Sequence, residues 1–179
     1  MRKTMYKAIL VWNFDKEEKW LNEMAAKGWC LVSVGFCKYE FAECEPGAYK
    51  ICMQLLNQDI KQPESQQYIA FLESTGAEQV GAFQRWVYFR KKAADGEFEL
   101  FSDYPSRIRH LSHIIHLIAT VIGCNWLIGI CNVLLATFNG SPLNYIGIAN
   151  LVIGIGGLIG LSRLFQKRKL LEQDGQVFE

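Results

Sequence analysis

Three histidines, His110, His113 and His116, recur at intervals of three residues beside a long apolar stretch. On a helix each step of three residues shifts the side chain by about 60° around the axis. Two of them, His110 and His113, could therefore ligate one metal ion with further ligands from elsewhere. A pH-sensing role is the alternative, because imidazole titrates near physiological pH. The interpretation we favour is that these side chains solvate lipid headgroups, so we expect no metal site and no cofactor.

Acidic side chains near the start of the sequence offer a second candidate chemistry. Glu17, Glu18 and Glu23 could form acid–base pairs, but their spacing is more typical of the solvated face and the cap of a helix. The glycine-rich run 154–157 resembles a phosphate loop only superficially, because it lies in an apolar segment and lacks the lysine that such a loop needs. No catalytic set emerges, and we predict a protein that is not an enzyme.

Basic and aromatic residues alternate in the segment 85–92, as they do in some RNA-binding strands. The balanced charge of the first 109 residues argues against a nucleic-acid partner. The six cysteines include no Cys-x-x-Cys pair, which fits a reducing compartment. Cys30, Cys37 and Cys44 are expected to be small buried thiols and not metal ligands.

Charge is distributed very unevenly along the chain. From His110 to Ser162 there is no Asp, Glu, Lys or Arg, which excludes a single soluble globule. Two apolar runs in this region, 114–138 and 143–165, are long enough to cross a bilayer. The turn between them, Asn139-Gly140-Ser141-Pro142, consists of helix breakers and is too short to hold a domain. We therefore predict a membrane hairpin in contact with the lipid bilayer.

The orientation of this hairpin follows from its flanking Lys and Arg residues. Basic residues lie before the first run and after the second, and none lies in the connecting turn: Arg107, Arg109, Arg163, Lys167, Arg168 and Lys169. Both termini should then be cytoplasmic, in a two-span protein of the plasma membrane. The segment 166–179 is a cytoplasmic tail.

The sequence of the first 95 residues predicts one small α+β domain. Strands are predicted at 6–14, 29–41, 48–56 and 79–89, with the second and third forming a hairpin. Helices run from the cap at Asp15 to Gly28 and from Pro63 to Gly76. The order β-α-β-β-α-β is that of the ferredoxin-like fold, with two helices on one face of a four-stranded sheet. Residues 96–113 form a juxtamembrane linker.

The predicted strands are apolar on both faces, although an antiparallel sheet usually has one polar face. One set of aromatic residues should therefore be exposed as a binding patch, for which we select Trp86, Tyr88, Tyr39 and Phe41. The alternatives left open are that this face packs on the chain's own segment 97–109, or on a second copy of the chain.

Small and polar residues follow one face of each predicted span. They are Asn125, Gly129 and Asn132 in the first span and Asn150, Gly154 and Gly157 in the second. Small residues let helices approach closely, and an Asn side chain can donate a hydrogen bond across the contact. We interpret both faces as the packing surface of the hairpin. A pore would require a homo-oligomer.

Three segments resemble the DUF2812 family. They are residues 14–29, which read FDKEEKWLNEMAAKGW; Tyr39-Glu40-Phe41 followed by EPGAY at 45–49; and ELFSDY at 99–104 followed by Ser106, Arg107 and Arg109. The resemblance covers residues 5 to about 113. It implies a small bacterial membrane protein of unestablished function, whose gene often lies beside that of a PadR-type transcription regulator. It supplies no catalytic residues.

These observations together predict a membrane-anchored, non-enzymatic binding or sensing module. Its aromatic sheet face would capture a cytoplasmic protein, for which the resemblance implies a PadR-type regulator. One alternative is a membrane-bound ligand-binding or enzymatic domain that uses the open sheet face as its pocket. Another is a subunit of a homo-oligomeric channel or transporter.

Overall fold

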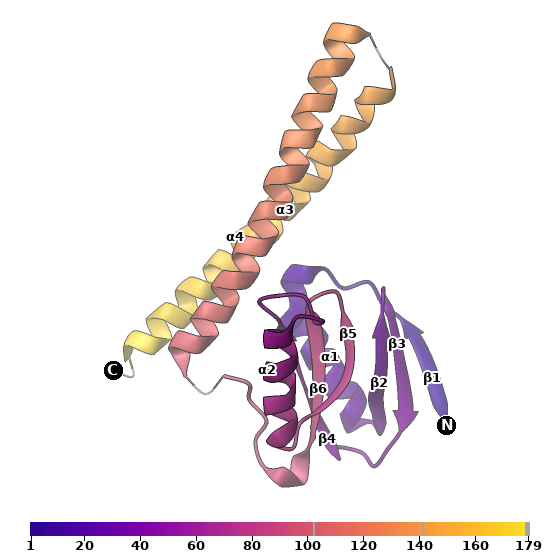
Figure 1. Cartoon of the computed structure of the whole chain (residues 1–179), viewed down its shortest axis with the longest axis vertical. Helices are drawn as coiled ribbons and strands as arrows, with labels where there is room; N and C mark the ends of the chain where they lie inside the picture. Colours follow the sequence, from indigo (N-terminus) through magenta and orange to yellow (C-terminus); the bar gives the residue numbers. More distant parts are fainter. Residues whose placement is uncertain (102, 141, 178–179) are drawn as a thin grey trace. The chain divides into compact units, whose positions relative to one another are not determined.

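The computed structural model describes residues 1–101, 103–140 and 142–177. The chain divides into two compact units, Met1–Leu100 and Phe101–Glu179. Unit 1 is a mixed α+β domain, and unit 2 is a pair of long helices (Figure 1). The boundary lies after Leu100, so the first part of the predicted linker 96–113 belongs to the domain and most of the rest is helical.

Unit 1 contains six strands and two α-helices in the order β-α-β-β-β-α-β-β. The elements are β1 (Arg2–Tyr6), α1 (Phe14–Ala26), β2 (Trp29–Gly35), β3 (Lys38–Glu43), β4 (Tyr49–Leu55), α2 (Pro63–Ser74), β5 (Glu78–Phe83) and β6 (Trp86–Lys92). Two short 3-10 turns, Val11–Asn13 and Ala93–Asp95, precede α1 and follow β6.

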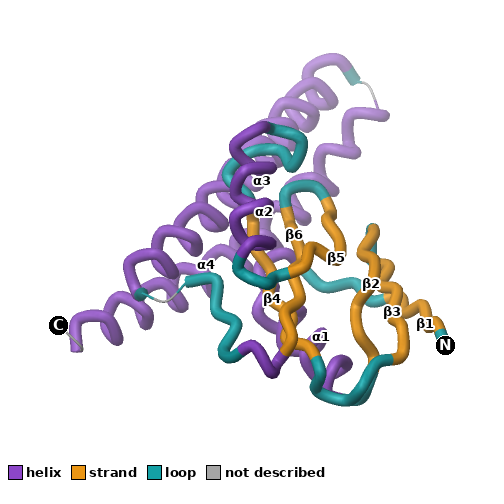
Figure 2. Tube along the Cα trace, turned by 60° about the horizontal axis from the view of Figure 1, so that its bottom comes forward, coloured by secondary structure: helices purple, strands orange, loops and turns teal. Residues whose placement is uncertain are grey.

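These elements form two copies of one βαββ unit. The antiparallel sheets have the orders β1-β3-β2 and β4-β6-β5, so the third strand of each copy lies between the other two (Figure 2). Buried residues correspond as well, since Leu21 and Met24 in α1 match Ile69 and Leu72 in α2. Two three-stranded sheets thus replace the predicted four-stranded ferredoxin-like sheet.

The difference arises because two predicted strands are in fact hairpins. Segment 29–41 turns between Gly35 and Lys38, and segment 79–89 turns between Phe83 and Trp86. The turns contain Cys37 at φ 51° and Gln84 at φ 55°. Such left-handed positions are usually occupied by Gly or Asn, so neither turn carries the expected sequence signal. The predicted strand at 6–14 is also wrong, because the first strand is Arg2–Tyr6.

Helix α1 lies between the two sheets, whereas α2 covers only the second. Leu21 and Met24 of α1 are buried, and Trp20 contacts β3 at Tyr39 while Phe14 contacts β6 at Trp86. Helix α2 packs on the opposite face of β6, where the core contains Leu56, Ile69, Leu72, Ala77, Val87 and Phe89. The sheet β4-β6-β5 therefore has a helix on each face.

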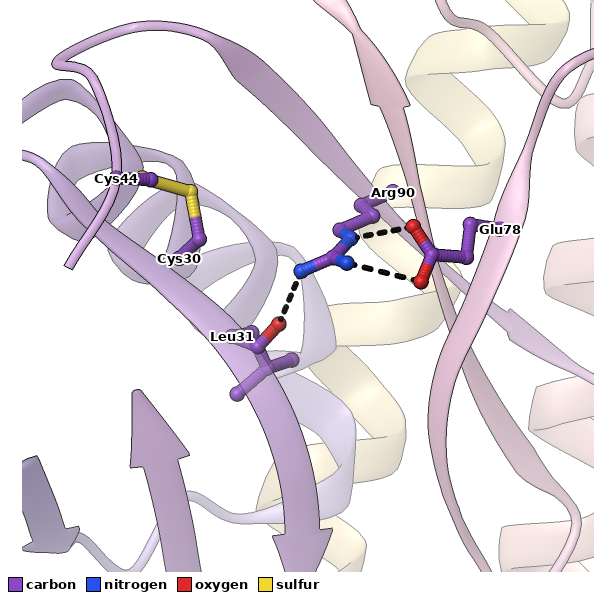
Figure 3. Close-up of a disulfide and its surroundings, with 5 residues drawn as sticks. All are labelled: Cys30, Leu31, Cys44, Glu78 and Arg90. Atoms are coloured by element: carbon purple, nitrogen blue, oxygen red, sulfur yellow. Dashed lines mark hydrogen bonds and ion pairs between the residues drawn. A yellow bond between two sulfur atoms is a disulfide. The ribbon is translucent and has the colours of Figure 1, made fainter. Parts of the chain in front are cut away.

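The two sheets meet where β2 approaches β5. At Gly81 of β5 an added Cβ would lie 3.1 Å from the backbone nitrogen of Val34, so a larger residue would have to push the two strands apart slightly. Arg90 of β6 joins Glu78 through two hydrogen bonds of 2.8 Å and donates a third, of 3.4 Å, to the Leu31 carbonyl (Figure 3). This side chain therefore links the second βαββ unit to β2 of the first.

Unit 2 consists of α3 (Tyr104–Asn139) and α4 (Gly147–Val177), with the short 3-10 helix Pro142–Ile146 between them. The Asp103 carboxylate caps α3 by accepting a hydrogen bond from the Ser106 amide, and Gly140 ends it at φ 65°. Ser141, which belongs to the predicted turn, lies outside the described residues. Both helices are long and apolar enough to cross a membrane.

Candidate functional site

The predicted aromatic patch is not exposed. Tyr39, Phe41, Trp86 and Tyr88 are all buried, with at most 8% of any of these residues accessible. The prediction of exposure is wrong because it assumed that both helices cover the same face of one sheet. In the structure Trp86 and Tyr88 face α1, while Val87 and Phe89 face α2. The aromatic residues thus line the contact between α1 and the two sheets.

A buried carboxylate lies at this contact. Glu17 of α1 is 7% exposed, and its Oε1 atom accepts hydrogen bonds from the Tyr39 and Tyr88 hydroxyls, each 2.7 Å long. Tyr39 lies on the central strand of the first sheet and Tyr88 on the central strand of the second. We call these three residues the Glu17 centre. It connects both βαββ units through one carboxylate oxygen.

The two tyrosines of the Glu17 centre are held in their protonated form. Burial and the hydrogen bond to Glu17 raise the pKa of Tyr39 above its ordinary value. Burial and the negative charge of Glu17 raise the pKa of Tyr88 in the same way. Both hydroxyls are therefore donors at physiological pH, and the carboxylate is held in one orientation by two neutral groups.

The Glu17 carboxylate has no positive partner in the described part of the chain. No Lys, Arg or His nitrogen of residues 1–101, 103–140 and 142–177 lies within 4.0 Å of it. Within the same ranges, Oε2 accepts no hydrogen bond, so both protein donors converge on Oε1. A buried carboxylate is ordinarily paired with a cation or a metal ion. Among the described side-chain atoms that are shut off from solvent, only Trp126 Nε1 lacks a hydrogen-bond partner, so Oε2 of Glu17 is within reach of water.

Further aromatic rings pack near the tyrosines of the Glu17 centre. Trp20 stands edge-on to Tyr39 at 5.0 Å and to Phe41 at 5.8 Å between ring centroids. Phe14, one helical turn before Glu17, lies 5.5 Å from Trp86. Trp86 and Tyr88 share one face of β6, since side chains two residues apart in a strand point the same way. Tyr39 of the centre therefore packs against an indole ring, and a second pair of rings lies on the face of β6 that carries Tyr88.

One of these rings already holds a cation of the protein. The Lys7 ammonium lies 4.1 Å from the centroid of the Trp20 ring. A cation at this distance is attracted by the negative face of the ring, and indole is the strongest of the aromatic side chains in this respect. Lys7 is exposed and lies just after β1, so the ammonium reaches the aromatic cluster from its solvent side.

Two neighbours of Glu17 fix the position of α1. Glu18 Oε2 accepts a hydrogen bond of 2.7 Å from the Met53 amide. The Asn22 side chain accepts one of 3.0 Å from the Ile51 amide and donates one of 2.7 Å to the Ile51 carbonyl. These side chains hydrogen-bond the backbone groups on the edge of β4 that does not pair with β6. The helix that carries Glu17 is thereby joined to the second sheet by side chains.

The sequence interpretation placed Glu17 on a solvated helix face, and this was wrong. A signal for burial was present, because Glu17 lies four residues before Leu21 and seven before Met24, both of which are buried. Glu23 is exposed, as expected for the solvated face of this helix. Neither the tyrosine partners nor the second sheet could be identified without the correct strand assignment.

The packing residues predicted for the hairpin lie as follows. A Cβ at Gly129 would approach the Gly147 carbonyl to 3.0 Å, and one at Gly157 would approach Ile122 to 2.6 Å. At Gly154 the position is occupied by the Trp126 ring, whose buried Nε1 has no hydrogen-bond partner in residues 103–140 and 142–177. These glycines thus lie between α3 and α4.

The asparagines predicted to pack the hairpin are half-buried: Asn125, Asn132 and Asn150. The Asn125 side chain donates a hydrogen bond to the Val121 carbonyl of its own helix.

The histidines and cysteines show different arrangements. His110 packs on the Phe101 ring at 4.8 Å between centroids. In the described residues, no group of three or more His, Cys, Asp or Glu side chains that could hold a metal ion includes His110 or His113.

Cys30 and Cys44 form a disulfide (Figure 3), contrary to the expectation of free buried thiols, because pairing of β2 with β3 brings their Cα atoms to 5.9 Å. Cys37 is a free thiol and partly exposed.

Comparison with known proteins gives one match. No curated protein and no solved structure matches the chain. A family model described as "Protein of unknown function (DUF2812)" matches residues 13–122. The match includes Glu17, Tyr39 and Tyr88 and extends into α3, and it covers more than half of the sequence. The chain therefore belongs to the DUF2812 family.

Proposed function

We propose that this protein is a membrane-anchored sensing module that binds a small molecule at the Glu17 centre and is not an enzyme. The observation that carries the proposal is a buried carboxylate held by two tyrosine hydroxyls, with one oxygen unused by the described residues. Because Oε2 is not shut off from solvent, a small molecule that approaches from the same side can bind this oxygen. Tyrosines kept protonated suit binding better than proton transfer.

The position of the Glu17 centre fits a sensing role. The centre joins the central strands of both βαββ units, so a ligand that moves the carboxylate acts on both sheets at once. A ligand can change the state of a protein only if it binds one arrangement of these parts more tightly than another. Capture of a PadR-type regulator stays a prediction, and the buried aromatic face cannot be its surface.

A ligand screen of the full-length protein in lipid nanodiscs tests the proposal. We expect compounds that raise the melting temperature by several degrees, because a ligand at about 100 times its Kd stabilises the folded state by about 2.7 kcal/mol. Bound compounds should slow amide hydrogen exchange in α1, β3 and β6. Helix α2 is the internal control, since it lies on the other face of β6. Protection confined to α2, or no stabilising compound in a chemically mixed library, would contradict the proposal.

The two apolar helices supply the membrane anchor in this proposal. Their glycines are used in the contact of α3 with α4, which supports a hairpin more directly than a channel subunit. The Lys and Arg distribution favours cytoplasmic termini, whereas the Cys30–Cys44 disulfide is a feature more typical of oxidising compartments. The charge distribution and the disulfide therefore favour opposite orientations of the protein. We give priority to the charges because they act during membrane insertion.

Cysteine labelling measures the orientation directly. A cysteine at Asn139, which is exposed at the end of α3, should react with a membrane-impermeant maleimide in intact cells. A cysteine at Asp95, exposed in unit 1, should react only after the membrane is permeabilised. The background strain carries the protein with its native free cysteines replaced. The reverse pattern would place unit 1 outside the cell and make the disulfide a permanent feature.

A further inference from the structure

We infer that unit 2 binds the phosphate group of anionic phospholipids at a cluster of side chains on one side of the helix pair: His110, His113, Arg163 and Lys167. We call these four residues the headgroup cluster. The inference rests on the membrane anchor of the proposed function and is independent of the Glu17 centre. It names the class of lipid that the anchor selects.

The register of α3 against α4 places Arg163 level with His116. Glycines of α4 lie against residues of α3 in reverse order: Gly157 against Ile122, and Gly175 against Tyr104. Arg163 comes six residues after Gly157, and His116 comes six residues before Ile122. Because the helices are antiparallel and rise equally per residue, both side chains start from one height along the pair.

This height coincides with one border of the hydrocarbon core of a bilayer. From His116 to the end of α3 at Asn139 the helix rises about 35 Å, close to the ~30 Å thickness of that core. Lys167, His113 and His110 lie three to six residues further from the apolar end, or about 5–9 Å. The polar headgroup layer on each side of a bilayer is about 5–8 Å thick. The headgroup cluster therefore spans the layer that contains the lipid phosphates.

The four side chains of the headgroup cluster share one side of the helix pair. His113 and Lys167 act electrostatically on His110, so the lysine of α4 lies near the histidines of α3. Arg163 precedes Lys167 by four residues, and side chains at this spacing share a face of a helix. Arg163 is exposed, and the other three residues are half-buried. The cluster thus combines two cationic side chains with two imidazoles, each of which can donate an N–H.

The composition of this part of the chain favours an anion as the ligand. Helix α3 contains no Asp or Glu, and the first acidic residue of α4 is Glu172, which forms an ion pair with Arg168. A guanidinium group matches the geometry of a phosphate, and an ammonium group binds it as a point charge. An anion between like charges also relieves their mutual repulsion. At this height in a bilayer the abundant anion is the lipid phosphate.

The positive charge of the cluster selects anionic over zwitterionic lipids. A phosphatidylcholine headgroup carries its own ammonium group beside the phosphate, and the charges of Arg163 and Lys167 repel that group. A phosphatidylglycerol headgroup carries the phosphate without a cation. Basic residues beside a membrane span attract anionic lipids in this way. Inorganic phosphate lacks the acyl chains that hold a lipid phosphate at the height of the cluster.

Spin-labelled lipids measure this preference directly. Full-length protein is reconstituted in phosphatidylcholine vesicles that contain a trace of phosphatidylglycerol or phosphatidylcholine labelled on the acyl chain. The fraction of label that electron paramagnetic resonance shows to be immobilised should correspond to about threefold or stronger preference for phosphatidylglycerol. Equal association of the two labels would overturn the inference and leave the Glu17 centre unaffected. Absence of any immobilised lipid would overturn it as well and would contradict the membrane anchor.

Two double variants with the same loss of charge locate the preference. Arg163→Gln with Lys167→Gln removes both cationic groups of the headgroup cluster, so the two labels should associate almost equally. Arg109→Gln with Lys169→Gln removes two exposed charges of the same helices outside the cluster and should keep most of the preference. An equal loss in both would overturn the inference, since the preference would then follow net charge alone. Arg163→Gln changes only an exposed side chain and gives the same test if the first double variant does not fold.

Inorganic phosphate separates a lipid headgroup from a soluble anion. A millimolar excess of phosphate, exchanged for chloride at constant ionic strength, should leave the preference for phosphatidylglycerol unchanged. Loss of the preference under these conditions would overturn the inference, because the cluster would then take a soluble anion.

Discussion

Truncation of Phe89 to alanine is expected to destabilise unit 1 strongly. The side chain is fully buried in β6, within the core that α2 forms with the second sheet. Removal of a buried phenyl ring costs about 3–5 kcal/mol, from the lost burial and from the cavity that remains. A small domain has a total stability of only about 5–15 kcal/mol, so the loss takes a large share of it. Thermal unfolding of the full-length protein in nanodiscs measures the effect.

The matched control for Phe89 lies in the same βαββ unit. Phe71 is on the outer face of α2 and is 61% exposed, so Phe71→Ala removes the same ring from a position that is mainly in water. We expect a change within about 0.5 kcal/mol. Similar melting temperatures for the two variants would show that α2 does not pack on β6 as described.

Replacement of Gly157 by leucine should separate α3 from α4. An added Cβ at this position would lie 2.6 Å from Cγ1 and 2.8 Å from Cδ1 of Ile122, closer than nonbonded carbon atoms approach. Larger side chains in a packed contact cost about 1–3 kcal/mol or force a rearrangement. Spin labels at Thr120 and Ser162, both exposed, should report a broader and longer distance distribution in the variant.

The neighbouring glycine provides the control for this second prediction. Gly156 has no atom within 4 Å of an added Cβ, so Gly156→Leu extends from the helix without a clash. Its distance distribution should match that of the unsubstituted protein. If both leucine variants broaden the distribution, helix propensity or lipid contact, and not the close approach at Gly157, controls the hairpin.

The sequence was sufficient to predict two helices in the first unit and two long apolar helices in the second. Periodicity and the closing glycines placed α1 and α2 to within a few residues, because Gly28 and Gly76 adopt left-handed conformations that favour glycine. The predicted cap at Asp15 was wrong, since α1 begins at Phe14 and the residue before it is Asn13. The uncharged stretch identified the two long apolar helices, since length and hydropathy alone make such a segment suitable for a bilayer. The family resemblance is confirmed by the family model.

The strands could not be predicted with the same success, and the site depended on them. Cys37 and Gln84 adopt turn conformations that their side chains do not favour, so each hairpin looked like one long strand. Strand β1 is short, charged and exposed, which removes the apolar alternation by which a strand is identified. Without β3 and β6 as separate central strands, no argument from sequence could bring Tyr39 and Tyr88 to one carboxylate.

The hydrogen bonds from Glu18 and Asn22 to β4 have a consequence for self-association. An open strand edge invites pairing with another chain, and growth into a fibre requires two such edges on each molecule. In unit 1 the edge of β4 is used by α1, and β2 and β5 approach each other. Of the six strands this leaves only the outer edge of β1 for another chain. Copies crowded together on a membrane could therefore join edge to edge only as two-fold pairs, and such an association stops at two chains.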